Sequence, residues 1–376
     1  MRFGVVFELS VPRPWTVGAE KAVYENCLEQ ARLADELGFE IAWAVEHHFL
    51  EEYSHCSSPE VLLSAIAAQT TRLRLGHGIV VCVPEINHPI RIAERIAVLD
   101  VISGGRVDVG TGRSASWMEL GAFGANPERT KKSWDEYLRA FPQMWTQERF
   151  SWDGQTFSCP PRCVLPKPIQ QPHPPLWVAV TSPGTELEAA SRGCGSLGLT
   201  FGGFAEQEKR IKNYRARIQQ CDPVGKMVVN QVNTTNFLYC HEDRKTGMKT
   251  GRKIAGMFNY LAAQIVMARD AFPSQSYPTG GLLSALREAA KHAKPSEPGL
   301  PAMPEGMALG DPERIIAELK RWESVGVDRV NFLLNMYEIL PQEDVLASMR
   351  LFASEVMPEF DRRERSSAQA VEAAVV

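Results

Sequence analysis

The chain repeats one hydrophobic pattern: a short run of branched apolar residues, a turn, and a stretch whose apolar positions recur at helical spacing. The first unit combines a strand at residues 2–7 with a helix at residues 19–37, and Gly38 marks the end of that helix. The same pattern continues to about residue 110. It predicts strands at 40–45, 73–81 and 106–109 and helices at 59–69 and 89–102.

After this point the pattern loosens and then returns. The sequence RFSWDGQTFSC, residues 149–159, has an Asp-Gly turn between alternating aromatic residues and predicts an inserted β-hairpin. Asp311 and Pro312 mark the start of a helix that Gly326 ends. The remaining predicted elements are helices at 129–145, 186–191, 206–219 and 341–360 and strands at 176–180, 195–200, 228–240 and 329–334.

Strands that alternate with helices in this way favour an α/β fold, a (β/α)8 TIM barrel with insertions, over an open doubly wound sheet. We expect one barrel domain over residues 1–361, with the hairpin insertion at about 149–160. Residues 270–309 are rich in Pro, Gly, Ser and Lys, which predicts a mobile lid, and residues 362–376 are expected to form a flexible tail. In such a barrel, chemistry takes place at the carboxyl ends of the strands.

Composition excludes several classes of function. Of the 376 residues, 44% are hydrophobic and 23% charged, and the formal net charge of −4 comes without a long basic run, so no nucleic-acid partner is expected. Eight cysteines are too dilute for a disulfide scaffold and their spacing fits no metal site, which favours a reducing cytoplasm and no metal. No stretch approaches the roughly 20 apolar residues that cross a bilayer, so no membrane association is expected. No GxSxG elbow or Walker-type loop is present.

Two histidines follow the second predicted strand, in the sequence EHH at residues 46–48. Side chains alternate between the faces of a strand, so His47 shares a face with Trp43 while His48 lies on the other. Adjacent histidines therefore cannot converge on one metal ion, and His47 is the one expected to point into the barrel mouth. The alternative, in which both histidines only cap the strand through hydrogen bonds, remains open at this point.

Two later segments predict an anion site. VGTGRS, residues 109–114, has Gly110 and Gly112, which let a planar group approach the backbone, and Arg113, whose guanidinium suits an anion. TSPGT, residues 181–185, combines hydroxyl groups with free amides at a helix start, which suits a phosphate. Both segments follow neighbouring strands of a barrel, so one phosphate is expected to contact both. A structural turn and simple helix capping are the respective alternatives.

Several sequence blocks follow one another in a fixed order. They are MRFGVVF at the start, EHHF at 46–49, HPIR at 88–91, LDVISGGRVDVGTGR at 99–113, LWVAVTSPGT at 176–185, GDPERI at 310–315 and SMRLFASEVMPEF at 348–360. In this order they resemble the bacterial luciferase-like, flavin-dependent monooxygenases, in particular the luciferase alpha chain, over nearly the whole chain. The resemblance implies a (β/α)8 barrel with an insertion and a long active-site loop.

The resemblance also implies roles for individual residues. It makes His47 catalytic, the first histidine of EHH. It implies an FMN whose phosphate is held after the fourth and fifth strands and whose ring lies over GHGIV at 76–80. The implied cofactor-binding residues are Gly76, His77, Gly78, Gly112, Arg113, Thr181, Ser182, Thr185 and Phe201. Light-emitting relatives carry a cysteine at the position of Gly112 and a glutamate at that of Thr181, so light emission is not expected.

Together these roles imply a two-component monooxygenase. A separate flavin reductase would supply reduced FMN, because the chain lacks a convincing dinucleotide fingerprint, and a C4a-peroxyflavin formed with dioxygen would oxygenate a small apolar organic substrate. The alternatives are a flavin- or deazaflavin-dependent reductase of the same superfamily and a non-catalytic flavin-binding protein. Family members commonly dimerise, and the small residues of the helix at 59–69 suit a homodimer. The expected substrate pocket contains Trp43, Met257, Phe258 and Tyr260.

Overall fold

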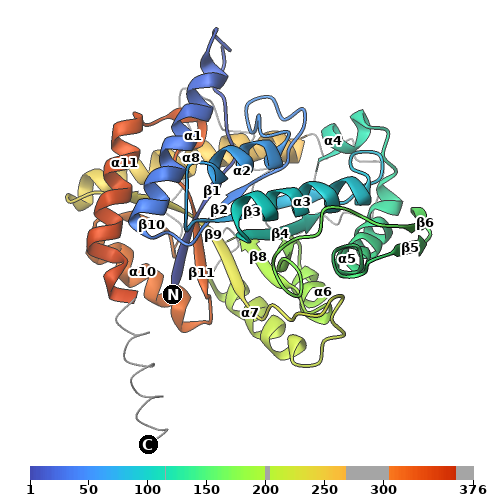
Figure 1. Ribbon diagram of the computed structural model, residues 1–376. Helices are drawn as coiled ribbons and strands as arrows, with labels where there is room; N and C mark the ends of the chain where they lie inside the picture. Colours follow the sequence, from blue (N-terminus) through green and yellow to red (C-terminus); the bar gives the residue numbers. More distant parts are fainter. Residues whose placement is uncertain (115, 200–203, 268–304, 361–376) are drawn as a thin grey trace, which may run out of the picture.

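The computed structural model describes residues 1–114, 116–199, 204–267 and 305–360. Within these ranges, parallel strands form a closed ring with helices on the outside (Figure 1). The eight strands of the ring, in spatial order, are β1 (Arg2–Phe7), β2 (Ile41–Ala44), β3 (Arg74–Val81), β4 (Val107–Gly112), β7 (Leu176–Val180), β8 (Gly195–Leu199), β9 (Val232–Cys240) and β11 (Arg329–Leu333). Pairing of β8 with β9, β9 with β11 and β11 with β1 closes the ring, which confirms the predicted (β/α)8 barrel.

Helices connect the strands and cover the barrel. The first, α1 (Ala19–Leu37), ends at Gly38 in the left-handed conformation that the sequence predicts there, with φ 87°. The other helices around the ring include α2 (Pro59–Ala67), α3 (Pro89–Ser103), α5 (Thr130–Thr146), α6 (Thr185–Ser191), α7 (Phe204–Ile218), α10 (Pro312–Ser324) and α11 (Gln342–Leu351), which continues as a π-helical turn over Phe352–Val356. None of the helices in the described ranges is long and apolar enough to cross a membrane.

Two helices were not predicted from the sequence. One is α4 (Trp117–Ala122), which is too short to show a helical period. The other is α8 (Arg244–Met267), whose Gly247 and Gly251 weaken its helical pattern. Both glycines lie against β10 (Ala308–Gly310), where an added Cβ would come within 2.7 Å of that strand's atoms. Close packing of the helix on β10 therefore explains why glycine stands in its interior.

The strands also differ in extent from the prediction. β4 continues to Gly112 instead of ending at residue 109, and β9 begins at Val232 instead of residue 228. β10 pairs in parallel with the end of β9, so residues 308–310 form a buried strand and are not part of the predicted lid. Residues 270–304 of that lid, and the predicted tail at 362–376, lie outside the described residues.

An antiparallel pair stands at the position of the predicted hairpin. β5 (Phe150–Asp153) and β6 (Ser158–Arg162) form a two-stranded sheet apart from the barrel. Their connecting turn is fixed by Glu136 of α5, whose carboxylate accepts hydrogen bonds from the amides of Gln155 at 2.5 Å and Thr156 at 2.9 Å. The insertion is therefore held against a helix of the barrel.

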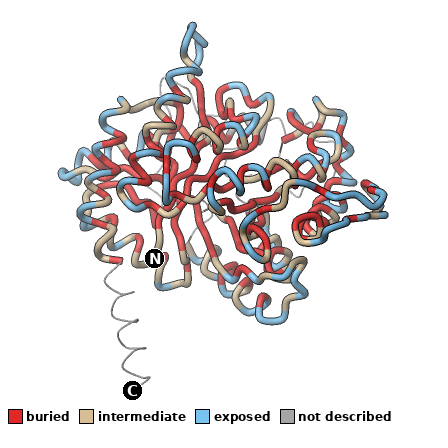
Figure 2. The backbone as a smooth tube through the Cα atoms, in the orientation of Figure 1, coloured by how far each residue is buried: buried red, intermediate tan, exposed pale blue. Residues whose placement is uncertain are grey.

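The lower interior of the barrel is filled by two tryptophans. The rings of Trp43 on β2 and Trp177 on β7 meet edge to face, with centroids 5.8 Å apart. Gly76 and Gly195 face these rings so closely that an added Cβ would lie 2.2 Å from an indole carbon in each case. Glycine is thus required at both positions for this packing. The buried strands belong to one continuous core (Figure 2). Trp43 also lines the cavity at the carboxyl ends of the strands.

Candidate active site

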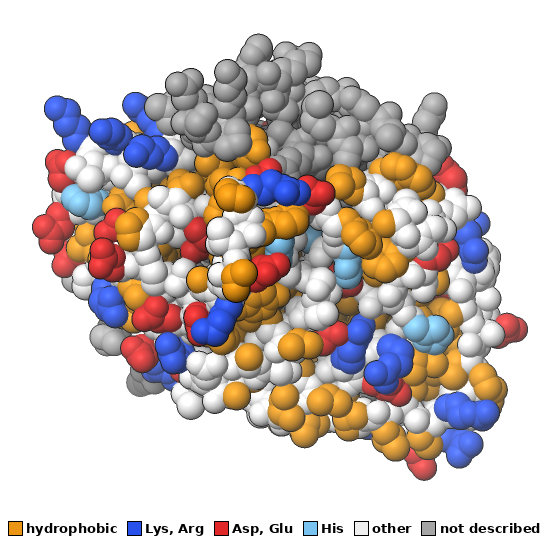
Figure 3. Space-filling view, turned by 90° about the horizontal axis from the view of Figure 1, so that it is seen from above, with side chains coloured by type: hydrophobic (Ala, Val, Ile, Leu, Met, Phe, Trp, Pro, Cys, Tyr) orange, Lys and Arg blue, Asp and Glu red, His pale blue; other side chains and the backbone are white. Residues whose placement is uncertain are grey.

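A cavity of about 330 Å³, open to solvent, lies at the carboxyl ends of the barrel strands. From above, hydrophobic side chains gather around a hollow near the middle of this face (Figure 3). Its apolar wall consists of Val6, Trp43, Val45, Ile79, Val178, Ala179, Leu197, Leu199, Phe258, Ala262 and Leu333. Polar side chains are concentrated at two ends of this cavity, one beyond β4 and β7 and the other beyond β1 and β2.

The first end contains both segments that predict an anion site. Arg113 directly follows β4, and Thr181, Ser182 and Thr185 follow β7. β4 and β7 pair with each other, so all four side chains line the same end of the cavity. The structure therefore brings together the arginine and the hydroxyl groups that the sequence placed on one phosphate.

Two further basic residues shape this first end. The buried Arg210 of α7 donates a hydrogen bond to the carbonyl oxygen of Ser182 at 2.8 Å and so holds the loop after β7 from behind. Lys131 of α5, which the sequence analysis missed, lines the cavity with its ammonium 3.0 Å from a carboxylate oxygen of Glu188. Arg113 and Lys131 thus place two cations at this end, a charge that favours an anionic ligand.

The surface between the two ends is poor in side chains. Gly78, Gly112 and Gly198 line it. A Cβ on Gly112 would lie 2.7 Å from the end of the Ile79 side chain, whereas one on Gly198 would meet nothing closer than 3.5 Å. Gly110 has a different reason to be glycine, because its Cβ would lie 2.2 Å from the carbonyl oxygen of His77 in the neighbouring strand. The sequence interpretation of Gly110 as a ligand-facing residue is therefore replaced by a packing role.

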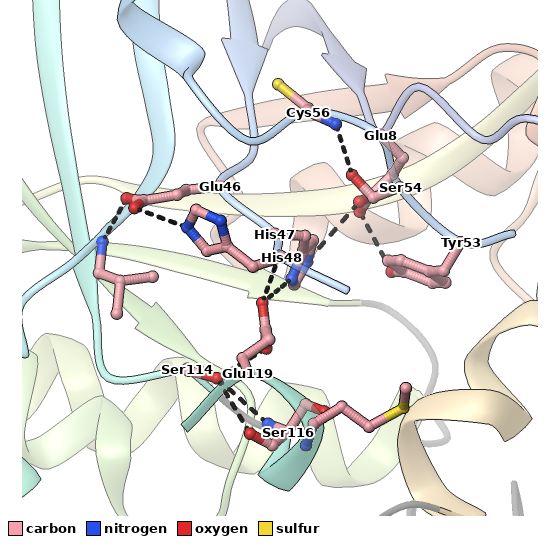
Figure 4. A network of polar contacts seen from close by, with 12 residues as sticks. Glu8, Glu46, His47, His48, Tyr53, Ser54, Cys56, Ser114, Ser116 and Glu119 are labelled. Carbon is pink, nitrogen blue, oxygen red and sulfur yellow. Dashed lines mark hydrogen bonds and ion pairs between the residues drawn. The ribbon is translucent and has the colours of Figure 1, made fainter. Parts of the chain in front are cut away.

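The second end is built around His47, which lines the cavity (Figure 4). Its Nδ1 lies 3.0 Å from Oε1 of Glu119 on α4. The same carboxylate accepts hydrogen bonds from the amide of His48 at 3.0 Å and from the hydroxyl of Ser114 at 2.7 Å. His48 turns away, to Glu46 at 3.3 Å. Of the two histidines, His47 thus faces the cavity and His48 supports the strand end.

The carboxylates around His47 change its protonation. Burial lowers the pKa of His47, because it disfavours a charged ring. The nearby carboxylates outweigh this effect and raise the pKa of His47 to about 9, with the largest contribution from Glu119 and smaller ones from Glu8 and Glu46. In turn, although burial favours the neutral acid, the charge on His47 and the hydrogen bond from Ser114 hold the pKa of Glu119 below its usual value. His47 is therefore an imidazolium at neutral pH, with one N–H on Glu119 and the other turned toward Glu8.

Glu8 follows β1 and lines the cavity opposite His47. Its Oε1 accepts a hydrogen bond from the hydroxyl of Tyr53 at 3.2 Å, and its Oε2 lies 3.8 Å from Nε2 of His47. This Oε2 is buried and has no hydrogen-bond partner among the described residues. Burial raises the pKa of Glu8.

Sequence reasoning missed Glu8, Tyr53 and Glu119 for different reasons. Glu8 was visible as a carboxyl group that interrupts an apolar run, but nothing local indicates what it faces. Ser116 and Glu119 have the Ser-x-x-Glu spacing of a helix start, and the Ser116 hydroxyl does accept a hydrogen bond from the amide of Met118. That signal predicts α4, yet it does not predict the contact of Glu119 with His47. Tyr53 has no sequence signal that we recognise.

Some predicted site residues lie away from the cavity. Gly76 packs on Trp43, and His77 is buried outside the barrel interior, where burial lowers its pKa to about 4. In α8, Phe258 lines the cavity, but Met257 and Tyr260 are not part of its wall, and the Tyr260 hydroxyl donates to Glu52 at 3.0 Å. Phe201 lies outside the described residues. The predicted residues that line the cavity are Trp43, His47, Gly78, Gly112, Arg113, Thr181, Ser182, Thr185 and Phe258.

The model of the luciferase-like monooxygenases matches residues 1–329. The chain belongs to the luciferase-like monooxygenase family. Membership confirms the family predicted from the sequence blocks and the assignment of a monooxygenase enzyme. It also agrees with the closed barrel and with a cavity at the carboxyl ends of its strands.

Individual relatives of this luciferase-like protein are distant but cover most of the chain. Over 344 residues, 91% of each chain, it is 26% identical to the oxygenase component of the flavin-dependent trigonelline monooxygenase of Acinetobacter baylyi. Its structure resembles monooxygenase RslO1 from Streptomyces bottropensis, with a TM-score of 0.77 and 26% identity over 96% of this chain and 100% of that one.

Two more distant structures share the fold alone. One is the oxygenating constituent of 3,6-diketocamphane monooxygenase from Pseudomonas putida in complex with FMN, with a TM-score of 0.74 and 17% identity over 95% of this chain and 98% of that one. The other is the coenzyme F420 dependent tetrahydromethanopterin reductase from Methanopyrus kandleri, with a TM-score of 0.67 and 19% identity over 96% and 99%. The shared barrel thus occurs with more than one cofactor.

Proposed function

We propose that this chain is the oxygenase component of a two-component monooxygenase. It would use dioxygen and reduced FMN from a separate flavin reductase to oxygenate a small apolar organic substrate. The observation that carries the proposal is one apolar cavity with two cations and three hydroxyl groups at one end and a buried histidine–glutamate pair at the other. The relative from Acinetobacter baylyi, an oxygenase component by name, supports the same assignment.

The side chains at the cavity fit FMN. Arg113 and the hydroxyl groups of Thr181, Ser182 and Thr185 are suited to hold its phosphate. Gly78, Gly112 and Gly198 line the cavity without projecting a side chain into it, which suits the approach of a flat ring. Bound in its reduced form, FMN supplies the electrons that activate dioxygen.

The chain itself contributes an apolar cavity wall and a proton held at a defined position on His47. A ligand that covers the apolar wall displaces water from it, which strengthens the hydrogen bonds made there. Glu119 fixes the orientation of the His47 ring, so its second N–H is directed toward the cavity side at Glu8. His47 thereby holds a proton that it can donate to an oxygen atom in the cavity.

Titration with FMN tests the end of the cavity beyond β4 and β7, the anion end. In the Arg113→Ala variant we expect the dissociation constant of FMN to rise about 10- to 100-fold, because a hydrogen bond between charged groups is worth about 1.5–3 kcal/mol. Arg217→Ala, in the last turn of α7 and away from the carboxyl ends of the strands, is the matched control and should leave the constant unchanged. Equal binding by the wild type and Arg113→Ala would contradict the phosphate assignment.

A flavin- or deazaflavin-dependent reductase is the second candidate, favoured by the fold shared with the F420-dependent reductase. Anaerobic titration with reduced FMN and with reduced F420 identifies the cofactor that binds. The loaded protein is then mixed with labelled dioxygen and a panel of apolar substrates. An atom of labelled oxygen in the product supports the monooxygenase, whereas reduction of a substrate without oxygen supports the reductase. Binding of FMN without any turnover would indicate a flavin-binding protein.

We further propose that the protein is a homodimer. Of the small residues of α2 that were expected to supply the contact, Ala67 is buried in the protein's own core, whereas Ala65 is half-buried and Ala68 is exposed. Large apolar side chains on α2 and α3 are instead exposed, among them Val61 at 68% and Ile102 at 58%. If the protein is a dimer, sedimentation of the wild type should give twice the chain mass of 41.8 kDa, and Ile102→Asp should lower that mass to one chain. A mass of one chain for the wild type would contradict the dimer.

A further inference from the structure

The gap between Glu8 and His47 has an unusual length. Oε2 of Glu8 and Nε2 of His47 are 3.8 Å apart, too far for a direct N–H···O hydrogen bond of about 2.9 Å. The separation is nevertheless shorter than two hydrogen bonds placed end to end, so one oxygen atom placed to the side of the line between them is able to bond to both. Oε2 is buried and has no hydrogen-bond partner in the described chain, so it keeps the capacity to accept a hydrogen bond.

Both sides of the gap are held in place. The hydroxyl of Tyr53 bonds to the other oxygen of Glu8, and Glu119 holds the other nitrogen of His47. The backbone turns sharply directly after Glu8, where Leu9 has a φ of 54°, a conformation that is costly for a residue other than glycine. Neither side chain is therefore free to rotate and close the gap by itself.

The cavity that contains the gap has a largely apolar wall. Val6, Val45, Phe258 and Leu333 line the same cavity. A ligand that reaches the gap must therefore bury an apolar body and present a single polar atom to Glu8 and His47.

We propose that the gap is a subsite for a hydroxyl group of the substrate and that Glu8 is the residue that selects it. The hydroxyl donates a hydrogen bond to Oε2 of Glu8 and accepts one from Nε2–H of His47. The substrate class that this arrangement fits is an uncharged, apolar molecule with a hydroxyl group. The inference rests on the proposed function, because it places the substrate in the same cavity as the flavin.

Charge and donor geometry exclude close analogues. The groups that face His47 are carboxylates, Glu119 at 3.0 Å and Glu8 at 3.8 Å, with Glu46 behind them on His48. The cations Arg113 and Lys131 line the other end of the cavity. A ligand carboxylate at the gap would therefore be repelled by Glu8 and Glu119 and attracted only by the His47 imidazolium. A methyl ether lacks the O–H that Oε2 of Glu8 requires.

Three probes of one shape test the proposal: 2-naphthol, 2-methoxynaphthalene and 2-naphthoate. Their dissociation constants are measured by calorimetry on the protein loaded with oxidised FMN and, separately, without FMN. We expect the naphthol to bind about tenfold more tightly than the ether or the carboxylate, the effect of one hydrogen bond to a charged group. In Glu8→Gln, the amide NH2 group takes the place of Oε2, so a hydrogen-bond donor replaces the acceptor there. The preference for the naphthol over the ether should therefore disappear.

Controls separate this inference from the function on which it rests. Glu8→Gln should bind FMN as the wild type does, which shows that the variant is folded, and Glu51→Gln at an exposed rim position should keep the naphthol preference. If FMN binds but the wild type does not prefer the naphthol, or if Glu8→Gln keeps the preference, the hydroxyl subsite is wrong and the flavin site stands. If FMN fails to bind, the proposed function fails, and the preference without FMN still decides the subsite.

Discussion

The two ends of the cavity hold their ligands by different means. At the end beyond β4 and β7, Arg113 and Lys131 share the task of binding an anion with several hydroxyl groups, so each contributes a part of the affinity. At the end beyond β1 and β2, His47 is bonded to Glu119 and faces Glu8, and only one of its two N–H protons is directed into the cavity. A change at the first end should therefore alter binding gradually, whereas a change at the second should alter turnover sharply.

The largest effect is expected from His47→Ala. Loss of a positioned acid or base typically lowers turnover by about 100- to 10,000-fold, while the FMN dissociation constant should stay unchanged because the anion end is intact. Oxygenated product is measured with a separate flavin reductase supplying reduced FMN. His88→Asn, which keeps the cap of α3 at an exposed histidine, is the control. Wild-type turnover in His47→Ala would remove His47 from the mechanism, and weaker FMN binding would show that the two ends are not independent.

Glu119→Gln sharpens the comparison by removing a charge while keeping a polar side chain of the same shape. Without that charge, the pKa of His47 should fall from about 9 toward its ordinary value. If turnover needs the protonated ring, the basic limb of the pH profile moves to lower pH, with a loss of roughly 30-fold at pH 8 and little loss at pH 6. A pH profile that does not move would show that Glu119 supports only the structure.

The sequence predicts the two ends of the cavity unequally, and the reason is physical. Arg113 and the TSPGT segment are local patterns after strands, so the barrel order alone places them together. The partner of His47 is not local: Glu119 is 72 positions away and reaches the ring from a helix of six residues. Which side chain faces another across a barrel mouth depends on the strand ends and turns, and hydrophobic periodicity carries no information about these.

The glycines show the same limit. Gly76, Gly110 and Gly112 all stand in the predicted flavin region, but only Gly112 lines the cavity. Gly76 makes room for Trp43, and Gly110 makes room for the backbone of β3. A glycine in a strand indicates a close approach, but the sequence does not say whether the approaching group is a ligand or the protein itself.

Gly110→Ala and Gly112→Ala test that distinction. At Gly110 the new methyl group meets the carbonyl oxygen of His77, a backbone atom, so we expect a loss of about 1–3 kcal/mol in the free energy of unfolding. At Gly112 it meets the movable end of the Ile79 side chain, so stability should change less and FMN binding should weaken instead. Urea unfolding and FMN titration measure the two effects. The reverse pattern would exchange the roles of the two glycines.

The smallest expected effect is a pH-dependent change in the free energy of unfolding, which we expect only from changes at the His47 end of the cavity. The pKa of His47 is raised on folding, so its contribution is complete below the ordinary value of about 6.5 and is lost as the pH rises through about 9. The pKa of Glu119 is lowered, so its contribution is present above about 4.5 and is lost as the pH falls below. Between these limits Glu119→Gln should cost about 1–2 kcal/mol, because the buried imidazolium loses one of the carboxylates that offset its burial.

Urea unfolding of the wild type and Glu119→Gln at pH 7 and pH 10 checks this window. The difference in unfolding free energy should be present at pH 7 and nearly absent at pH 10, where the wild-type ring has lost its proton as well. Arg113→Ala, at the other end, should show the same small difference at both values because its guanidinium does not titrate there. A difference in Glu119→Gln that persisted at pH 10 would mean that Glu119 stabilises α4 through its hydrogen bonds to Ser114 and the His48 amide rather than through the charge on His47.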